Sequence, residues 1–137
     1  MARRRLSHEG TLVLDSEGLS RLLADDEAVV ALVAEARSRG MEVVFCALTI
    51  IETVHARTNE ARPNRVLSGL RTVPVGDEEA KAVSALLMRA GLHGRKYAVD
   101  AAVAETALRQ HRPVVMLASD IDDMAKLCGD RVRLVPV

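Results

Sequence analysis

Short aliphatic runs alternate along this chain with longer segments of helical periodicity, and this alternation limits its possible folds most strongly. Extended runs are expected at residues 11–14, 42–46, 71–75, 113–117 and 131–135. Helical segments are expected between them, at about residues 19–23, 26–39, 49–60, 66–70, 77–90, 98–111 and 121–128. Strands that alternate with helices form a mainly parallel sheet covered on both faces, joined by right-handed crossovers. We therefore predict an α/β fold, a three-layer α/β/α sandwich, as a single domain over residues 11–137 after a flexible arm at 1–10.

The composition narrows the function. The 137 residues suffice for one domain, and the 49% that are hydrophobic are almost all aliphatic. With no Trp, one Tyr (Tyr97) and one Phe (Phe45), the chain lacks an aromatic platform for stacking single-stranded bases. Lys plus Arg and Asp plus Glu each number 19, so a uniformly basic nucleic-acid coat protein is not expected. Any attraction for phosphates must come from local patches or a bound cation.

The cysteines and the amino-terminal sequence bear on the compartment. Cys46 and Cys128 form no C-x-x-C pair, and we expect two buried free thiols. Residues 1–10 lack the apolar stretch of a signal peptide, and no apolar run reaches the length of a membrane span. The expected location is the reducing cytoplasm, with no membrane partner.

Four acidic residues follow expected strands or open expected helices. Asp15 comes directly after the first strand, and Glu52 follows the second by six residues. Asp100 lies near the start of its helix after a loop at 94–96, and Asp120 follows the strand that ends at 117. Ligands of parallel sheets bind beyond the carboxyl ends of the strands, where the strand order reverses. We predict that these four carboxylates converge there.

Such a cluster is costly without a cation, because two like charges 4 Å apart repel by about 4 kcal/mol at an effective dielectric constant of 20. Ligands that are all oxygen favour Mg²⁺ or Mn²⁺ over zinc. The chemistry expected of such a site is phosphodiester hydrolysis. Each acid also has a possible purely structural role. Asp15 and Asp120 would be helix N-caps, Glu52 a solvated surface residue, and Asp100 a charge that interacts with a helix dipole.

The segments that carry these acids resemble, in order and spacing, the motifs of PIN-domain nucleases and, among them, VapC-like toxins. The segments read LVLDS at 12–16, ALTIIE at 47–52, VDAAVA at 99–104 and ASDIDDM at 118–124. The resemblance implies a PIN-like fold, Mg²⁺- or Mn²⁺-dependent endoribonuclease activity, frequent homodimers and a small antitoxin that blocks the site. It assigns metal binding and catalysis to these acids, with a fifth as an additional ligand: Asp15, Glu52, Asp100 and Asp120, with Asp123 as the fifth.

One position departs from the family pattern. The family often has Thr or Ser two residues before its fourth acid, where this chain has Ala118. Ser119 is the candidate to supply the missing hydroxyl, and Ser16 is the candidate partner of Asp15. These hydroxyls would orient the acids rather than bind the ion themselves.

Other polar and apolar residues have two readings each. Basic residues that flank the acids would hold RNA phosphates or form a solvated surface. His55 is a further acid–base candidate or a surface residue. The aliphatic stretches at 19–23 and 29–33 exceed what one buried helix face needs, and would form a dimer or antitoxin groove or belong to the core. The basic residues are Arg57, Arg62, Arg65, Arg95 and Lys96.

The expected function is therefore a metal-dependent endoribonuclease, the toxin of a VapBC-type pair. The alternative is a catalytically weak or inactive PIN-like scaffold, which Ala118 and the zero net charge favour slightly. A response-regulator phosphoacceptor fits less well, because no acid precedes Asp15. A phosphatase with Asp-x-Asp after its first strand also fits poorly, because Glu17 stands where the second Asp belongs.

Overall fold

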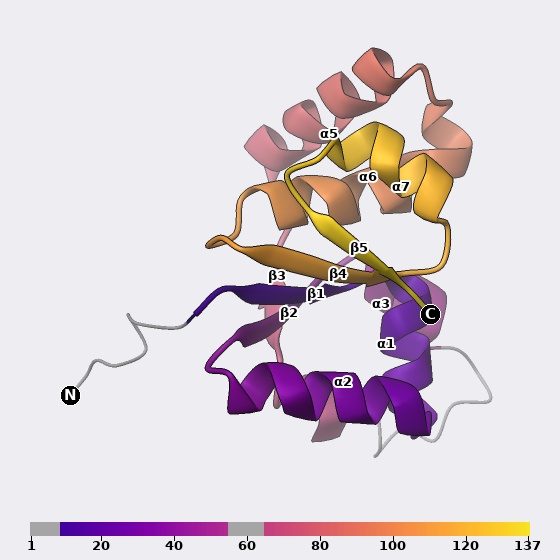
Figure 1. Ribbon diagram of the computed structural model, residues 1–137. Helices are drawn as coiled ribbons and strands as arrows, with labels where there is room; N and C mark the ends of the chain where they lie inside the picture. Colours follow the sequence, from indigo (N-terminus) through magenta and orange to yellow (C-terminus); the bar gives the residue numbers. More distant parts are fainter. Residues whose placement is uncertain (1–8, 55–64) are drawn as a thin grey trace.

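The structure, a computed structural model, describes residues 9–54 and 65–137 and contains a parallel five-stranded sheet (Figure 1). The strands lie in the order β3-β2-β1-β4-β5, and every neighbouring pair is parallel. Strand β1 is central, and the chain moves from it to β2 on one side and later to β4 on the other. The strands are β1 (Thr11–Leu14), β2 (Glu42–Cys46), β3 (Arg71–Val73), β4 (Val114–Ala118) and β5 (Arg133–Pro136).

Helices cover both faces of this sheet and complete the expected three-layer sandwich. Helices α5, α6 and α7 lie on one face, and α1 and α2 lie on the other (Figure 1). Helix α3 packs against α1 at the end of β2. The described helices are α1 (Ser16–Leu23), α2 (Glu27–Ser38), α3 (Thr49–Thr53), α5 (Asp77–Ala90), α6 (Gly94–Leu108) and α7 (Ile121–Cys128).

The core has two halves, one on each face of the sheet. Successive side chains of a strand point to opposite faces, so Val13 packs beneath α6 and α7 while Leu12 and Leu14 pack beneath α1 and α2. Phe45 is fully buried in the α1–α2 half. Small residues on the buried face of α6 let this helix approach the sheet closely. These residues are Ala101, Ala102, Ala104 and Ala107.

Several boundaries differ from the sequence-based prediction. Helix α1 begins at Ser16 rather than near residue 19 because Asp15 caps it, and β5 covers Arg133–Pro136 rather than 131–135. Helix α6 begins at Gly94 rather than near residue 98, because the His93 imidazole caps it and Nδ1 accepts a hydrogen bond of 3.2 Å from the Arg95 N–H. A glycine followed by two basic residues had indicated a loop. Helix α3 ends at Thr53 rather than near residue 60, and Val54 is extended. Residues 55–64 and 1–8, with the expected arm, His55, Arg57 and Arg62, lie outside the described residues.

Two expectations about the chain's general character can also be compared with the structure. Cys46 and Cys128 are both buried free thiols, as predicted, and burial raises the pKa of the Cys128 thiol to about 11. The Cys128 thiol is therefore not activated as a nucleophile by its surroundings. None of the helices in the described ranges combines the length and apolar character that a transmembrane segment needs.

Two methionines in the helices of one face offer a matched test of the packing. Met124 on α7 is 1% exposed, whereas Met88 on α5 is 80% exposed. Met124→Ala should lower the free energy of unfolding by about 2–5 kcal/mol, because it leaves a cavity in the core. Met88→Ala should change it by less than about 0.5 kcal/mol. Urea denaturation of both variants measures the difference, and equal effects would contradict the packing of α7 described here.

Candidate metal centre

Asp15 lies at the point where the chain order of the sheet reverses, between β1 and β4. It follows β1 directly, and only 4% of its surface is exposed. One carboxylate oxygen accepts from the Gly18 N–H at 2.7 Å and caps α1. The other accepts from the Ser119 N–H at 3.0 Å, just past β4. Asp15 is therefore an N-cap, as its simpler reading held, and also a link to β4.

Gly18 shows how closely α1 approaches β4 beside this carboxylate. A Cβ atom at Gly18 would lie 3.2 Å from the Leu117 carbonyl oxygen and 3.5 Å from the Asp15 carboxylate. A side chain at this position would be tight against the Leu117 carbonyl oxygen and in van der Waals contact with the Asp15 carboxylate. The sequence analysis did not single out Gly18, and the only sequence signal was a glycine three residues after the first acid.

Glu52 reaches the same edge from α3. The Ser16 hydroxyl donates a hydrogen bond of 2.5 Å to Glu52 Oε1, which links the first turn of α1 to α3. Ser16 therefore contacts Glu52 rather than Asp15, the partner expected from the sequence. Glu52 is otherwise exposed, so one of its carboxylate oxygens remains open to ligands.

Asp100 lies nearly two turns into α6 and is partly buried. Its position follows from the early start of α6 and removes it from the first turn, where a helix dipole acts most strongly. The pKa of Asp100 is raised to about 6, first by burial and then by the negative charges of the other acids. In decreasing order of effect these are Asp15, Glu52, Asp120 and Asp123.

Asp120 and Asp123 come from the start of α7. Asp120 is exposed and caps this helix, accepting from the Asp123 N–H at 3.3 Å. The Asp123 carboxylate lies 3.6 Å from the Lys126 ammonium. Ala118 is fully buried at the end of β4, and it is the backbone N–H of Ser119, not its hydroxyl, that is bonded to Asp15.

The five carboxylates are electrostatically coupled but do not form a closed ligand cage. Within residues 9–54 and 65–137, no three His, Cys, Asp or Glu side chains lie close enough together to hold a metal ion. The acids affect the pKa of Asp100 through their charges, but they do not lie close enough together to form a ligand shell. Burial raises the pKa of Asp15 as well, so two adjacent acids resist ionisation. A site of oxygen donors and excess negative charge fits a hard divalent cation in its chemistry.

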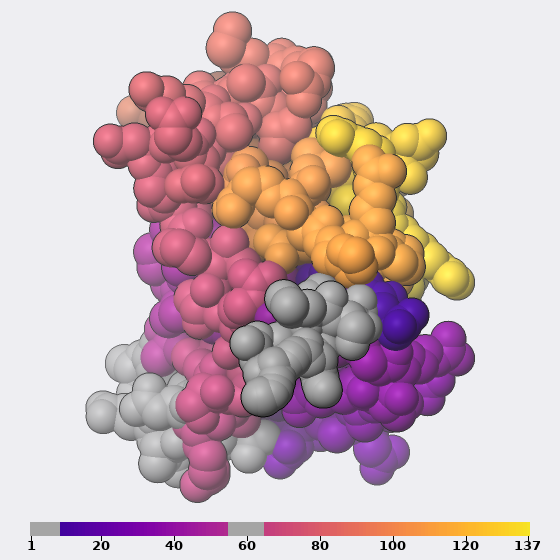
Figure 2. Space-filling model, turned by 90° about the vertical axis from the view of Figure 1, so that its left-hand side faces the viewer, coloured from indigo at the N-terminus to yellow at the C-terminus, as the bar shows by residue number. Residues whose placement is uncertain are grey.

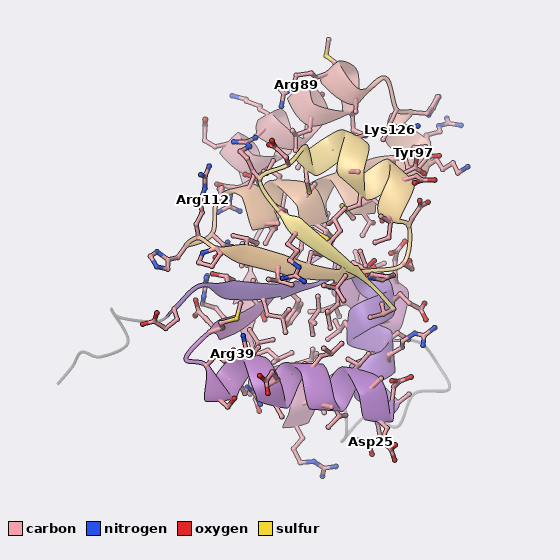
Figure 3. The ribbon with its side chains drawn as sticks, in the orientation of Figure 1. Asp25, Arg39, Arg89, Tyr97, Arg112 and Lys126 are labelled. Carbon is pink, nitrogen blue, oxygen red and sulfur yellow. The ribbon has the colours of Figure 1, made fainter. Side chains whose placement is uncertain are left out.

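Cations border the acids at this edge. Arg95 and Lys96 are exposed in the first turn of α6, and the Lys96 ammonium lies 5.2 Å from the centre of the Tyr97 ring. Tyr97 and Lys126 lie on the same side of the molecule, and Arg112 lies on the opposite side (Figure 3). The acids thus occur with exposed positive side chains that can pair with the phosphates of a bound polyanion.

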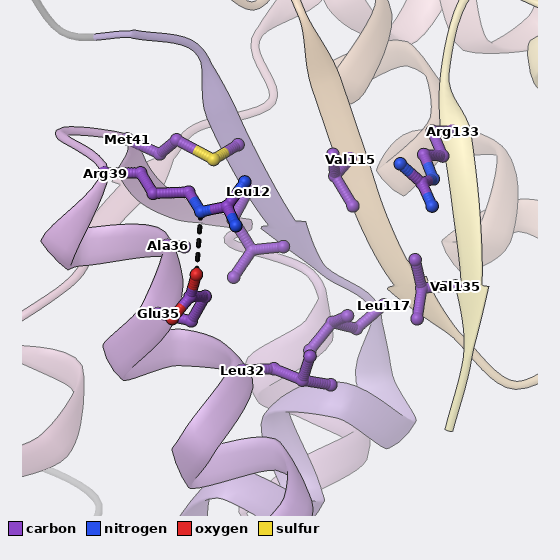
Figure 4. A pocket seen from close by; sticks show the side chains of 10 residues that line it. All are labelled: Leu12, Leu32, Glu35, Ala36, Arg39, Met41, Val115, Leu117, Arg133 and Val135. Atoms are coloured by element: carbon purple, nitrogen blue, oxygen red, sulfur yellow. Dashed lines mark hydrogen bonds and ion pairs between the residues drawn. The ribbon is translucent and has the colours of Figure 1, made fainter.

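The aliphatic surplus of α1 and α2 divides between the core and a groove. Leu19, Leu22 and Leu23 are buried, so ordinary core packing accounts for them. Leu32 on α2 is 38% exposed and lines a groove of about 320 Å³ between α2 and the same face of β4 and β5 (Figure 4). The Glu35–Arg39 ion pair, at 2.7 Å, lies beside this groove.

No protein-family model matches the chain, and no curated protein matches it by sequence. Its structure is similar to VapBC2 from Rickettsia felis, solved with a promoter DNA fragment, with a TM-score of 0.69 and 12% identity over 93% of this chain and 98% of that one. FitAcB from Neisseria gonorrhoeae matches with a TM-score of 0.61 and 18% identity, covering 90% and 96%. PAE2754 from Pyrobaculum aerophilum matches with 0.58 and 18%, covering 91% and 83%.

The chain has a PIN-like fold. The similarity covers 83% to 98% of the matched chain in each of these structures, and it confirms the predicted PIN-like fold class. Sequence identity this low carries the PIN-like fold alone, so the roles of individual residues depend on this chain's own geometry.

Neutralising Asp100 should stabilise the fold. A raised folded-state pKa means that stability is lost as pH rises between about 4 and 6. After allowance for partial solvent exposure, Asp100→Asn should raise the free energy of unfolding by about 1–2 kcal/mol above pH 6, and the gain should vanish near pH 4. Denaturant unfolding in EDTA across this range measures it.

Asp130→Asn is the matched control, because Asp130 is exposed at the other end of the sheet. It should leave stability within about 0.5 kcal/mol of the wild type at every pH. A destabilised Asp100→Asn variant at pH 7 would show that Asp100 makes a favourable contact instead of bearing unrelieved repulsion.

Proposed function

We propose that this chain is a Mg²⁺- or Mn²⁺-dependent endoribonuclease and the toxin of a VapBC-type toxin–antitoxin pair. Its PIN-like fold is that of toxin–antitoxin structures, and its four acidic motifs resemble those of VapC-like nucleases. The supporting observation from this chain itself is that acids from three other segments act on one carboxylate, that of Asp100.

Helix capping does not account for this arrangement. It explains Asp15 and Asp120, which do cap α1 and α7. It does not explain Glu52 or Asp100, which lie inside their helices and cap neither. Asp15 and Asp100 lower the stability of the fold, because burial and like charges oppose their ionisation. Such a cost is typical of residues that serve a functional site.

In this proposal Asp15, Glu52, Asp100 and Asp120 hold the ion, with Asp123 as a further ligand. The bound cation supplies an activated water and stabilises charge on the phosphate. The chain's own contribution is to fix and position the ligands. The backbone N–H groups of Gly18 and Ser119 hold Asp15, and the Ser16 hydroxyl holds Glu52. Arg95 and Lys96 would bind RNA phosphates at the rim.

The proposal includes a small antitoxin as partner and a homodimer as the assembled form. Among the similar structures, VapBC2 was solved as a complex bound to promoter DNA, and FitAB was solved bound to the IR36 DNA fragment. The groove beside Leu32 has the apolar lining and ion-paired border that suit an amphipathic segment of such a partner.

An inactive PIN-like scaffold is the second candidate, favoured by the buried Ala118 at the place of the usual hydroxyl. Metal affinity separates the two candidates. A scaffold has no use for the acids, whereas a nuclease should bind Mn²⁺ in calorimetry and lose affinity at least tenfold in Asp100→Asn.

The decisive test is cleavage of total cellular RNA by the purified protein with Mn²⁺, Mg²⁺ or EDTA. We expect discrete fragments with either ion, none with EDTA, and a loss of at least a hundredfold in rate for Asp100→Asn, because a ligand charge is removed. Glu78→Gln, the same conversion of a carboxylate to an amide at an 85% exposed side chain of α5 that lines neither edge site, should cleave at the wild-type rate.

Undiminished cleavage by Asp100→Asn would refute the site assignment. Absence of both cleavage and Mn²⁺ binding in the wild type would favour the scaffold. For the toxin role, induced expression in a bacterial host should arrest growth, and the Asp100→Asn variant at equal protein level should not.

A further inference from the structure

A second site of opposite charge lies at the amino edge of the sheet, away from the acids. An open hollow of about 610 Å³ lies where β4 and β5 begin. Figure 2 looks onto this side of the molecule, where the segment before β4, in orange, adjoins the segment before β5, in yellow. Three arginines and one acid supply its charged lining: Arg112, Arg131, Arg133 and Asp130.

Strand register brings these arginines together. Arg133 pairs with Val115 in the parallel ladder between β5 and β4. Arg131 therefore falls level with the residues just before β4, beside Arg112, and neighbouring strands are only about 4.8 Å apart. All three side chains are exposed at the hollow, although Arg133 also borders the groove beside Leu32 (Figure 4) and Arg131 also borders a hollow against α5 and α6.

Glutamates neutralise three other arginines of the chain. Arg39 is paired with Glu35 at 2.7 Å, Arg71 with Glu42 at 2.6 Å and Arg109 with Glu105 at 2.6 Å. In the part of the chain that the structure describes, Arg112, Arg131 and Arg133 have no such carboxylate partner. With Asp130 as the one acid of the lining, the hollow carries a net charge of +2, from three cations minus one anion.

The shape and chemistry of the hollow favour an extended polyanion. It is open rather than enclosed, so a chain can lie across it, and four of its six lining residues are charged. Planar guanidinium groups bind phosphate oxygens through paired hydrogen bonds. A chain of zero net charge needs such a local patch to attract nucleic acid, because the acidic edge repels phosphates.

We propose that Arg112, Arg131 and Arg133 form a binding site for the phosphodiester backbone of nucleic acid, a second contact for the RNA substrate at the far edge of the sheet. The identity of the ligand as nucleic acid rests on the proposed function. The two edges are separated by the length of a five-residue strand, about 17 Å, so one RNA molecule that follows the surface can contact both.

The test is binding of a short fluorescent single-stranded RNA in EDTA, over a series of KCl concentrations, by the wild type and by Arg112→Gln/Arg131→Gln. We expect the double variant to bind about tenfold more weakly at low salt, with the slope of log affinity against log salt smaller by about 1.4, or 0.7 for each lost phosphate contact. DNA of the same sequence is the second arm. If the double variant loses affinity for both polymers, the hollow binds the phosphodiester backbone that RNA and DNA share. If it loses affinity for RNA alone, the hollow binds the RNA substrate selectively.

Arg21→Gln/Lys81→Gln is the charge-matched control, because both cations are already ion-paired with neighbouring glutamates and line neither the hollow nor the groove beside Leu32. It should keep nearly the wild-type slope. An equal slope in Arg112→Gln/Arg131→Gln and this control would overturn the proposal, as would displacement of RNA by polyglutamate at equal charge. Binding in EDTA does not depend on catalysis. A wild type that binds RNA in EDTA but does not cleave it with Mn²⁺ or Mg²⁺ would refute the nuclease proposal and leave this binding site supported.

Discussion

The carboxylate of Asp15 holds together the part of the fold on which the site depends. Its two oxygens accept backbone hydrogen bonds from Gly18 and Ser119, which belong to segments more than a hundred residues apart in the chain. One group thus ends β1, starts α1 and fixes the turn after β4. Because Asp120 follows Ser119 directly, the same interaction also places the opening of α7. Structural and proposed catalytic roles coincide in this residue.

The remaining acids are arranged at the expense of stability. Burial and four neighbouring negative charges hold the pKa of Asp100 near 6, and burial raises that of Asp15. The neighbouring groups that could stabilise the charged form of Asp100 contact other acids. The Ser16 hydroxyl donates to Glu52, and the Lys126 ammonium is paired with Asp123. A fold selected for stability alone would replace Asp100 by an apolar residue, as its neighbours Ala101 and Ala102 illustrate. Under the proposed function, the stability cost of Asp100 is accounted for by the cation that it would bind.

Much of this could be predicted from the sequence, because strand and helix periods differ clearly in an aliphatic chain. The runs at 11–14 and 42–46 matched the observed strands, and Gly91 ended α5 in the left-handed conformation that favours glycine. The start of α6 was missed because capping by His93 depends on a side-chain orientation that no spacing rule encodes. The partner of Ser16 was missed because it depends on how α1 and α3 pack. The strand order alone predicts that the acids lie along one edge of the sheet. Predicting the hydrogen-bond partner of each acid requires the detailed packing of the helices.

Among the described residues, the two opposite edges of the sheet carry charges of opposite sign, and this separation contributes an electric dipole along the strands. Its positive end lies at the arginine hollow and its negative end at the carboxylates, along the direction of the strands. A polyanion approaching from any side exerts a torque on such a molecule and turns the arginine end toward itself before contact. The first encounter would then occur at the edge remote from the acids, and the catalytic edge would be reached only by subsequent movement of the polymer across the surface. In this respect zero net charge does not mean absence of steering, because orientation depends on how the charges are separated rather than on their sum.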